Sequence, residues 1–396
     1  MSDDAERTDE TTPVAGTRSK SERGALALRS TVREHVAEHL YLRPQLEAML
    51  GDANWCVDSV EWDGDELEIR GWAITPPDAY APATFTLDGR PFDEIDYPRA
   101  RADIGELFWF RPGARYSGFV CRTTAADRGS WPRGFATIDF ADRRSLAPFA
   151  PLRSFHLIDP DADALPIPEE ARRTRVHGND DVTSFLAQGA SAFVKLERAL
   201  EKSAAKSFDD LRSVLDWGCG CGRVSRYFAR HPNLALTGID IDASNVDWCR
   251  TNLPFARFET CQVDPPTGLE SSSFDLLFGI SVMTHLSEAD REAWLGELAR
   301  LARPGATALL TTQGASALCR SNADADRVAR WRQVGMIDVG VSVAASDLSP
   351  EPDRYIDCFL TPDYIRDRWS NEFEVVDLLE GYIGNAQDLV VLRRLD

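Results

Sequence analysis

A glycine-rich turn between a strand and a helix is the feature that most constrains this chain. Residues 216–222 read DWGCGCG, with glycine at every second position from Gly218. The apolar run before this turn, residues 213–215, predicts a buried strand, and residues 224–230 after it predict a helix. Glycines let the backbone turn tightly and approach a ligand closely, and the N–H groups at the start of a helix face that ligand. The pattern therefore predicts a ligand-binding loop in an α/β fold.

An acidic residue at the end of the next strand restricts which class of ligand the loop can bind. Residues 234–240 predict a second strand that ends at Asp240, a position typical of an acid that accepts two ribose hydroxyls. The spacing of the glycines differs from the dinucleotide fingerprint G-x-G-x-x-G, and Asp216 lies two residues before the first of them. A carboxylate there would repel a pyrophosphate and attract a ligand with a sulfonium and an ammonium group. We therefore expect S-adenosyl-L-methionine as the cofactor, in preference to a nicotinamide dinucleotide.

Strands and helices alternate along the rest of the C-terminal part. Further strands are expected at residues 256–261, 274–278, 306–312, 373–379 and 388–392, and helices at 244–251 and 288–302. This order predicts a mostly parallel sheet covered by helices, with a terminal pair of strands at one edge.

Several of these segments together resemble the class I S-adenosylmethionine-dependent methyltransferases. Residues 214–220 resemble the family's first motif, 238–241 its second, 273–277 its fourth strand and 301–306 the approach to the fifth. The resemblance implies a Rossmann-like sheet of seven strands with the last one antiparallel. Residues 279–286 and 387–390 are further similar to a bacterial branch that is often encoded among sugar and glycan biosynthesis enzymes.

The resemblance also implies the cofactor contacts. Asp216 and the backbone from Gly218 through Cys219 to Gly220 would hold the methionine part, and Asp240 the ribose. The other implied contacts are Ile241 on one face of the adenine, either Gln262 or Asp264 at the adenine amino group, and Gly279 and Ile280 where the fourth strand ends.

Methyl transfer to a hydroxyl group benefits from a general base beside an aligned acceptor. His285 follows the fourth strand and is the candidate catalytic base, since imidazole exchanges protons near neutral pH. The alternatives for His285 are a hydrogen-bonded residue at a helix start or a substrate contact without proton transfer. His177 and Arg223 are weaker candidates, and we expect Arg223 to pair with a surface carboxylate. No metal site is expected, because the C-x-C pair at Cys219 lacks the clustered partners that zinc requires.

The N-terminal part has a different pattern. Between residues 51 and 158, short alternating runs are broken by glycine, proline and aspartate, which predicts an antiparallel β-sandwich-like domain. Short motifs at 71–73, 87–89, 101–104 and 117–119 resemble small β-modules of glycan-biosynthesis transferases, although a structural or dimerising role is an equal alternative. The expected organisation is a disordered tail at 1–24, a helical segment at 25–50, a β-rich accessory domain at 51–158, a linker or lid at 159–181 and a methyltransferase domain at 182–396.

Composition restricts the partners and the compartment. The 44 basic and 64 acidic residues leave a net charge of −20, which disfavours nucleic acid and anionic membrane surfaces as partners. No apolar run is long enough for a membrane span of about 18 residues. The acidic N-terminus is the reverse of a secretory signal, and eight dispersed cysteines suit a reducing compartment, so we expect a cytoplasmic protein.

Together these features predict an enzyme that methylates a hydroxyl of a small-molecule or carbohydrate acceptor: a sugar, a glycan precursor or a related small metabolite. The alternatives are a non-catalytic binding protein that retains the fold and works through residues 51–158, and a nicotinamide-dependent oxidoreductase. The intact glycine loop disfavours the first, and the loop spacing disfavours the second.

Overall fold

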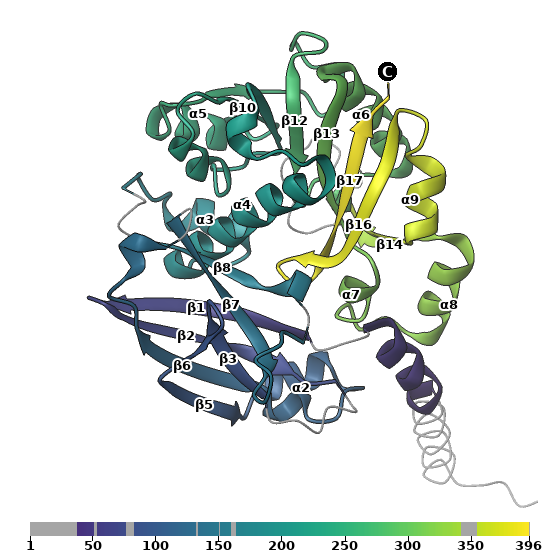
Figure 1. Cartoon of the computed structure of the whole chain (residues 1–396). Coiled ribbons are helices and arrows are strands. Elements are labelled where there is room, and N and C mark those ends of the chain that lie inside the picture. The colour runs from purple at the N-terminus through teal and green to yellow at the C-terminus, as the bar shows by residue number, and fades with distance from the viewer. Residues whose placement is uncertain are drawn as a thin grey trace, which may run out of the picture.

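The computed structural model describes residues 38–50, 54–76, 83–131, 134–149, 151–159, 164–341 and 355–395 (Figure 1). The expected disordered tail at 1–24 lies outside these ranges. Of the expected helical segment 25–50, residues 38–50 are described and are helical. Their buried leucines Leu42, Leu46 and Leu50 share an apolar cluster with Val328 and Trp331, so this helix packs against the C-terminal part of the chain.

The C-terminal part contains a seven-stranded sheet in the order β11-β10-β9-β12-β13-β17-β16. Its strands are β9 (Ser213–Trp217), β10 (Ala235–Asp240), β11 (Arg257–Thr260), β12 (Phe274–Gly279), β13 (Ala302–Thr312), β16 (Phe373–Ile383) and β17 (Gln387–Arg394). Strands β9 to β13 are parallel, and β17 is antiparallel to both β13 and β16. The predicted seven-stranded α/β sheet with an antiparallel last strand is therefore confirmed.

Helices bury both faces of this sheet, and a large apolar cluster lies on each. The helices of this part are α3 (Glu170–His177), α4 (Val182–Ala204), α5 (Ala243–Asn252), α6 (Glu288–Leu301), α7 (Ala315–Leu318), α8 (Ala325–Val334) and α9 (Pro362–Arg368). The helix expected at 224–230 is a short 3₁₀ helix, η7 (Ser225–Arg230), a form that suits such a short segment. A separate antiparallel pair, β14 (Met336–Val341) and β15 (Ile356–Leu360), completes this part.

Two four-stranded antiparallel sheets form the N-terminal part. One has the order β1-β2-β6-β5 and the other the order β4-β3-β7-β8. Their bounds are β1 (Asn54–Asp63), β2 (Glu66–Ile74), β3 (Ala83–Leu87), β4 (Arg90–Pro91), β5 (Glu94–Arg99), β6 (Gly118–Thr124), β7 (Phe135–Asp142) and β8 (Phe155–Ile158), with α2 (Ala102–Leu107) between β5 and β6. Side chains from both sheets, such as Ile69 and Phe85, share one apolar cluster. The assignment of residues 51–158 as a separate sandwich-like domain stays a prediction.

Helix α4 lies between the two parts (Figure 1). Phe193 and Leu196 of this helix pack in an apolar cluster with the large sheet, and Ala187 packs against the cluster of the N-terminal sheets. Within the described ranges, none of the helices is both long and apolar enough to cross a membrane.

Candidate functional site

A cavity of about 580 Å³ opens where the parallel strands end. Its walls follow the carboxyl ends of β9, β10 and β12, which is where open α/β sheets bind their ligands. The volume lies within the usual range for small-molecule and cofactor sites. The predicted site residues that line this cavity are Asp216, Gly218, Cys219, Gly220, Asp240, Ile241, Ile280 and His285.

The glycine loop takes a shape that side chains would prevent. Gly218 has φ +76° and Gly220 has φ +52°, both in the left-handed region that favours glycine. A Cβ at Gly218 would lie 2.3 Å from Val282 Cγ2, and one at Gly220 would lie 3.0 Å from Val176 Cγ2. The loop therefore packs closely against residues 176 and 282, which line the same cavity.

Asp216 places a buried carboxyl group in the cavity wall. Only 4% of the residue is exposed, and its Oδ2 accepts a hydrogen bond of 2.5 Å from Ser225 Oγ. Burial raises the pKa of this carboxyl group to about 7, because the charged form loses its hydration. A cationic group of a ligand would favour the ionised form, so the residue fits a ligand that carries an ammonium or sulfonium.

Asp240 joins the glycine loop to the second strand. Its Oδ2 accepts a hydrogen bond from the Gly220 N–H at 2.7 Å, and its Oδ1 accepts one from the Asp242 N–H at 2.8 Å. Burial raises the pKa of this carboxyl group as well. Each carboxylate oxygen can accept more than one hydrogen bond, so Asp240 retains acceptor capacity toward ligand hydroxyls.

Three predicted site residues are not among the described residues that line the cavity: Gln262, Asp264 and Gly279. Cys261 and Val263, which follow the end of β11, line it instead. Gly279 lies against Trp217, where a Cβ would approach the indole to 2.8 Å.

Helix α3, within the expected linker or lid, covers part of the cavity. Arg175 Nε lies 2.9 Å from Asp242 Oδ2, and Arg172 Nη1 donates to Asn245 Oδ1 at 3.1 Å. His177, at the end of α3, contacts Ser184 Oγ through Nε2 at 2.8 Å. Burial and the neighbouring guanidinium of Arg223 lower the pKa of His177 to about 4, so this imidazole is neutral at neutral pH.

Arg223 differs from its expected surface role. Its side chain is half-buried and lines the cavity, with Nη1 3.4 Å from His177 Nδ1. No described carboxylate lies within ion-pair distance of it, and burial lowers the pKa of its guanidinium. The sequence feature that could have indicated its place in the cavity is its position directly after the glycine loop. Arg223 and Asp216 thus bring a cation and an acid to one wall, which is complementary to an amino-acid zwitterion.

The same cavity is lined by the predicted base, His285. His285 Nδ1 lies 2.9 Å from Asp357 Oδ1 on β15. Ser281 has φ +61°, and its backbone N–H donates to Thr311 Oγ1 at 2.7 Å. Gln387 Nε2 donates to Ser281 Oγ at 2.8 Å, and both residues line the cavity together with Gln313 and Tyr355. Sequence reasoning missed Asp357, which lies 72 residues after His285 and has no motif around it.

All eight cysteines lie in the described ranges and are free thiols. Cys219 and Cys249 pack beneath the glycine loop, where both thiols face the Gly220 carbonyl. Among the described residues, no three potential metal ligands lie close enough together to hold an ion.

Residues 214–305 match a family model described as a methyltransferase domain. Over 161 residues the chain is 25% identical to an O-methyltransferase of Pyrenophora dematioidea. The aligned segment covers 37% of this chain and 57% of that protein. Over 146 residues the chain is 29% identical to an S-adenosyl-L-methionine-dependent Diels-Alderase of Talaromyces variabilis. That aligned segment covers 34% of this chain and 47% of the relative. The chain thus spans about half the length of these curated relatives.

Among solved structures, the 1,6-didemethyltoxoflavin-N1-methyltransferase of Burkholderia thailandensis overlaps with a TM-score of 0.38 at 16% identity. The overlap covers 62% of this chain and 96% of that one. The segment that matches the family model runs from β9 into the start of β13. It therefore includes the glycine loop, Asp240 and His285.

Proposed function

We propose that this chain, which belongs to the class I S-adenosylmethionine-dependent methyltransferases, transfers a methyl group to a hydroxyl of a small-molecule acceptor. One observation carries the proposal. The glycine loop, the buried Asp216 and the partly buried Asp240 share a cavity with His285, whose ring has an aspartate beside it.

The cofactor end of the cavity is the part around the glycine loop. Asp216 and Arg223 bind the ammonium and the carboxylate of the methionine part, while the loop backbone at Gly218 and Gly220 lies along it. Asp240 accepts hydrogen bonds from the ribose, and Ile241 packs on the adenine. When bound, S-adenosylmethionine supplies a methyl group that its sulfonium already activates, so the chain has to align the acceptor and remove its proton.

His285 is the proposed base. The Asp357 carboxylate lies 2.9 Å from Nδ1 and places a negative charge beside the ring, and we assign Nε2 to accept the hydroxyl proton of the acceptor. S-adenosylmethionine held by Asp216, Arg223 and Asp240 would give its methyl group to the acceptor oxygen, and the electron pair of the broken carbon–sulfur bond would remain on sulfur. The resulting imidazolium is stabilised by the Asp357 carboxylate.

The acceptor that we propose is a sugar, a glycan precursor or a related small metabolite. The side chains of Ser281, Gln313 and Gln387 offer donors and acceptors to a polyhydroxylated molecule, and Tyr355 offers an aromatic surface. The relative from Pyrenophora dematioidea is an O-methyltransferase, which agrees with an oxygen acceptor.

The proposal also assigns the other segments. Residues 51–158 form a sandwich-like accessory domain, 159–181 a lid over the cofactor end, and 182–396 the catalytic domain, acting in the cytoplasm. The lid is supported by the contacts of α3 with the start of α5, and the accessory domain by the apolar cluster that its two sheets share.

The test combines binding and turnover. Isothermal titration should give binding of S-adenosylmethionine in the micromolar range or tighter and no binding of NAD. Methyl-labelled cofactor incubated with nucleotide sugars, oligosaccharides and small phenols should then label a hydroxylated compound by one methyl mass. Failure to bind S-adenosylmethionine would refute the proposal and favour the non-catalytic alternative.

A further inference from the structure

The acceptor end of the cavity includes the end of the β16–β17 hairpin. Gly384 has φ +60° and Asn385 has φ +55°, and Ala386 N–H donates to the Ile383 carbonyl at 3.1 Å, so the turn is of the type I′ class. The two residues after it, Ala386 and Gln387, line the cavity. A shift of this turn would therefore move Gln387 relative to Ser281.

The turn is held by the N-terminal sheets. Asn385 is 2% exposed, and its Nδ2 donates to the carbonyl of Trp55 on β1. Arg320 Nη2 donates both to the Asn385 carbonyl and, at 2.7 Å, to Asn54 Oδ1 on the same strand. We call these four residues, Asn54, Trp55, Arg320 and Asn385, the junction cluster.

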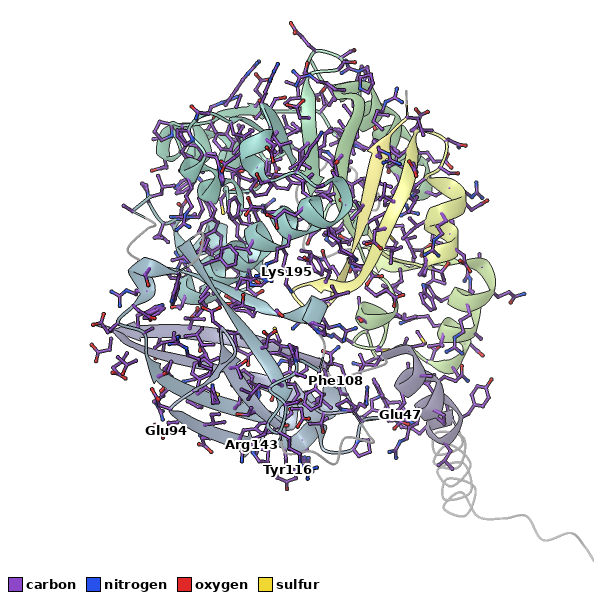
Figure 2. All side chains as sticks on the ribbon, in the orientation of Figure 1. Glu47, Glu94, Phe108, Tyr116, Arg143 and Lys195 are labelled. Atoms are coloured by element: carbon purple, nitrogen blue, oxygen red, sulfur yellow. The ribbon has the colours of Figure 1, made fainter. Side chains whose placement is uncertain are left out.

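The charge of Arg320 makes this cluster unusual. Among the described residues no carboxylate lies within ion-pair distance of its guanidinium, and burial lowers its pKa to about 10. The guanidinium instead lies over the rings of Trp72 and Phe108, at 5.4 and 5.5 Å from their centroids. Both rings belong to the N-terminal part, and Figure 2 labels Phe108 there. Aromatic faces and carbonyl oxygens thus replace water around this cation, and they do so only when the two parts are packed together.

A second set of contacts holds the hairpin just before the turn. Lys195 of α4, labelled in Figure 2, donates from Nζ to the Tyr382 carbonyl at 2.7 Å. A Cβ at Gly381 would lie 3.0 Å from Arg153 Nε, so the residue between β7 and β8 packs directly on the hairpin. The end of the hairpin is therefore bound from two sides by groups outside the seven-stranded sheet.

We propose that the N-terminal sheets position the acceptor wall of the active site through the junction cluster, with Arg320 and Asn385 as positioning residues for Gln387. This inference rests on the proposed function, because it takes the Gln387 end of the cavity as the acceptor site. It gives residues 54–158 a role in shaping the acceptor site from outside, with no sugar bound to the sheets themselves.

The test uses the full chain and two variants. Asn385→Gly keeps the left-handed backbone and removes the amide that bonds Trp55, and Arg320→Met removes the charge at similar length. Asn322→Gly is the matched control, since Asn322 also has a left-handed φ of +52° and is exposed. Exposed Arg330→Met is the control for the arginine change.

The first readout needs no acceptor. Hydrogen exchange in peptides that cover residues 381–388 should rise by about tenfold in both variants and stay at the wild-type rate in both controls. The affinity for S-adenosylhomocysteine should stay within about twofold of wild type, because the glycine loop does not contact the cluster. Exchange at the wild-type rate in both variants would overturn the proposal.

The second readout uses the acceptor identified by the methyl-labelling screen. Its KM should rise by about tenfold or more in both variants, with the KM for S-adenosylmethionine unchanged. Equal losses for acceptor and cofactor would mark general destabilisation and count against the proposal. Should Arg320→Met not fold, Asn385→Gly and Arg320→Lys decide the test. If the wild-type chain binds no S-adenosylhomocysteine, the proposed function fails, while the exchange comparison still decides whether the cluster holds the turn.

Discussion

Acidification should weaken the binding of S-adenosylhomocysteine, because it protonates Asp216 and removes the negative charge that faces the ligand's ammonium group. In the free protein burial raises the pKa of Asp216 to about 7, so at about pH 6 most molecules carry a protonated, neutral Asp216. The ligand's ammonium favours the ionised form, so binding must release that proton below about pH 7. With full ionisation in the complex, affinity should fall by about tenfold, or about 1.4 kcal/mol, between about pH 8 and about pH 6.

The Asp216→Asn variant tests the cause. The amide keeps the size of the side chain but cannot ionise, so the affinity should drop by about 1.5–3 kcal/mol and lose this pH dependence. The assay is isothermal titration at several pH values. 5′-Methylthioadenosine is the control ligand, because it keeps the nucleoside that faces Asp240 and lacks the ammonium and carboxylate. Its affinity should not show the Asp216 effect.

Two results would refute this reasoning. One is a wild-type affinity for S-adenosylhomocysteine that does not change over this pH range. The other is an Asp216→Asn variant with the same pH dependence as wild type, which would assign the proton to another group, with Asp240 the first to examine.

Further outcomes are expected at the loop and at the base. Asp240→Ala should weaken cofactor binding by about 2–4 kcal/mol in the same titration, and unchanged affinity would remove Asp240 from the site. His285→Gln should lower turnover by about 100-fold or more with cofactor affinity intact, and near-normal turnover would leave it a structural role. Gly218→Ala should lower the free energy of unfolding in denaturant titrations by about 1–3 kcal/mol more than Gly305→Ala. Gly305 is the control, because it has a similar φ of +72° but a Cβ there would meet no other atom within 4 Å. Equal losses in the two variants would exclude the clash with Val282.

The sequence alone predicted the sheet and placed the glycine loop and Asp240 at the ends of its strands. Alternating apolar runs predicted strands β9 to β13, β16 and β17, and the family resemblance implied their seven-stranded arrangement. The glycine spacing and Asp240 indicated the loop, and both line the cavity. These features were readable because each depends on a short segment: glycine backbone angles, strand periodicity and an acid at a strand end act locally, and the carboxyl ends of parallel strands meet at one edge.

The acceptor end depended on tertiary structure. Nothing in the sequence near residue 357 indicates that it faces His285, nor that a strand beginning at Asn54 holds the turn at Asn385. The sequence also left open which side chains after β11 line the cavity, and these are Cys261 and Val263, with Gln262 and Asp264 absent from the lining. Such contacts join residues far apart in the chain, and they arise from how whole elements pack, which no local period or motif encodes.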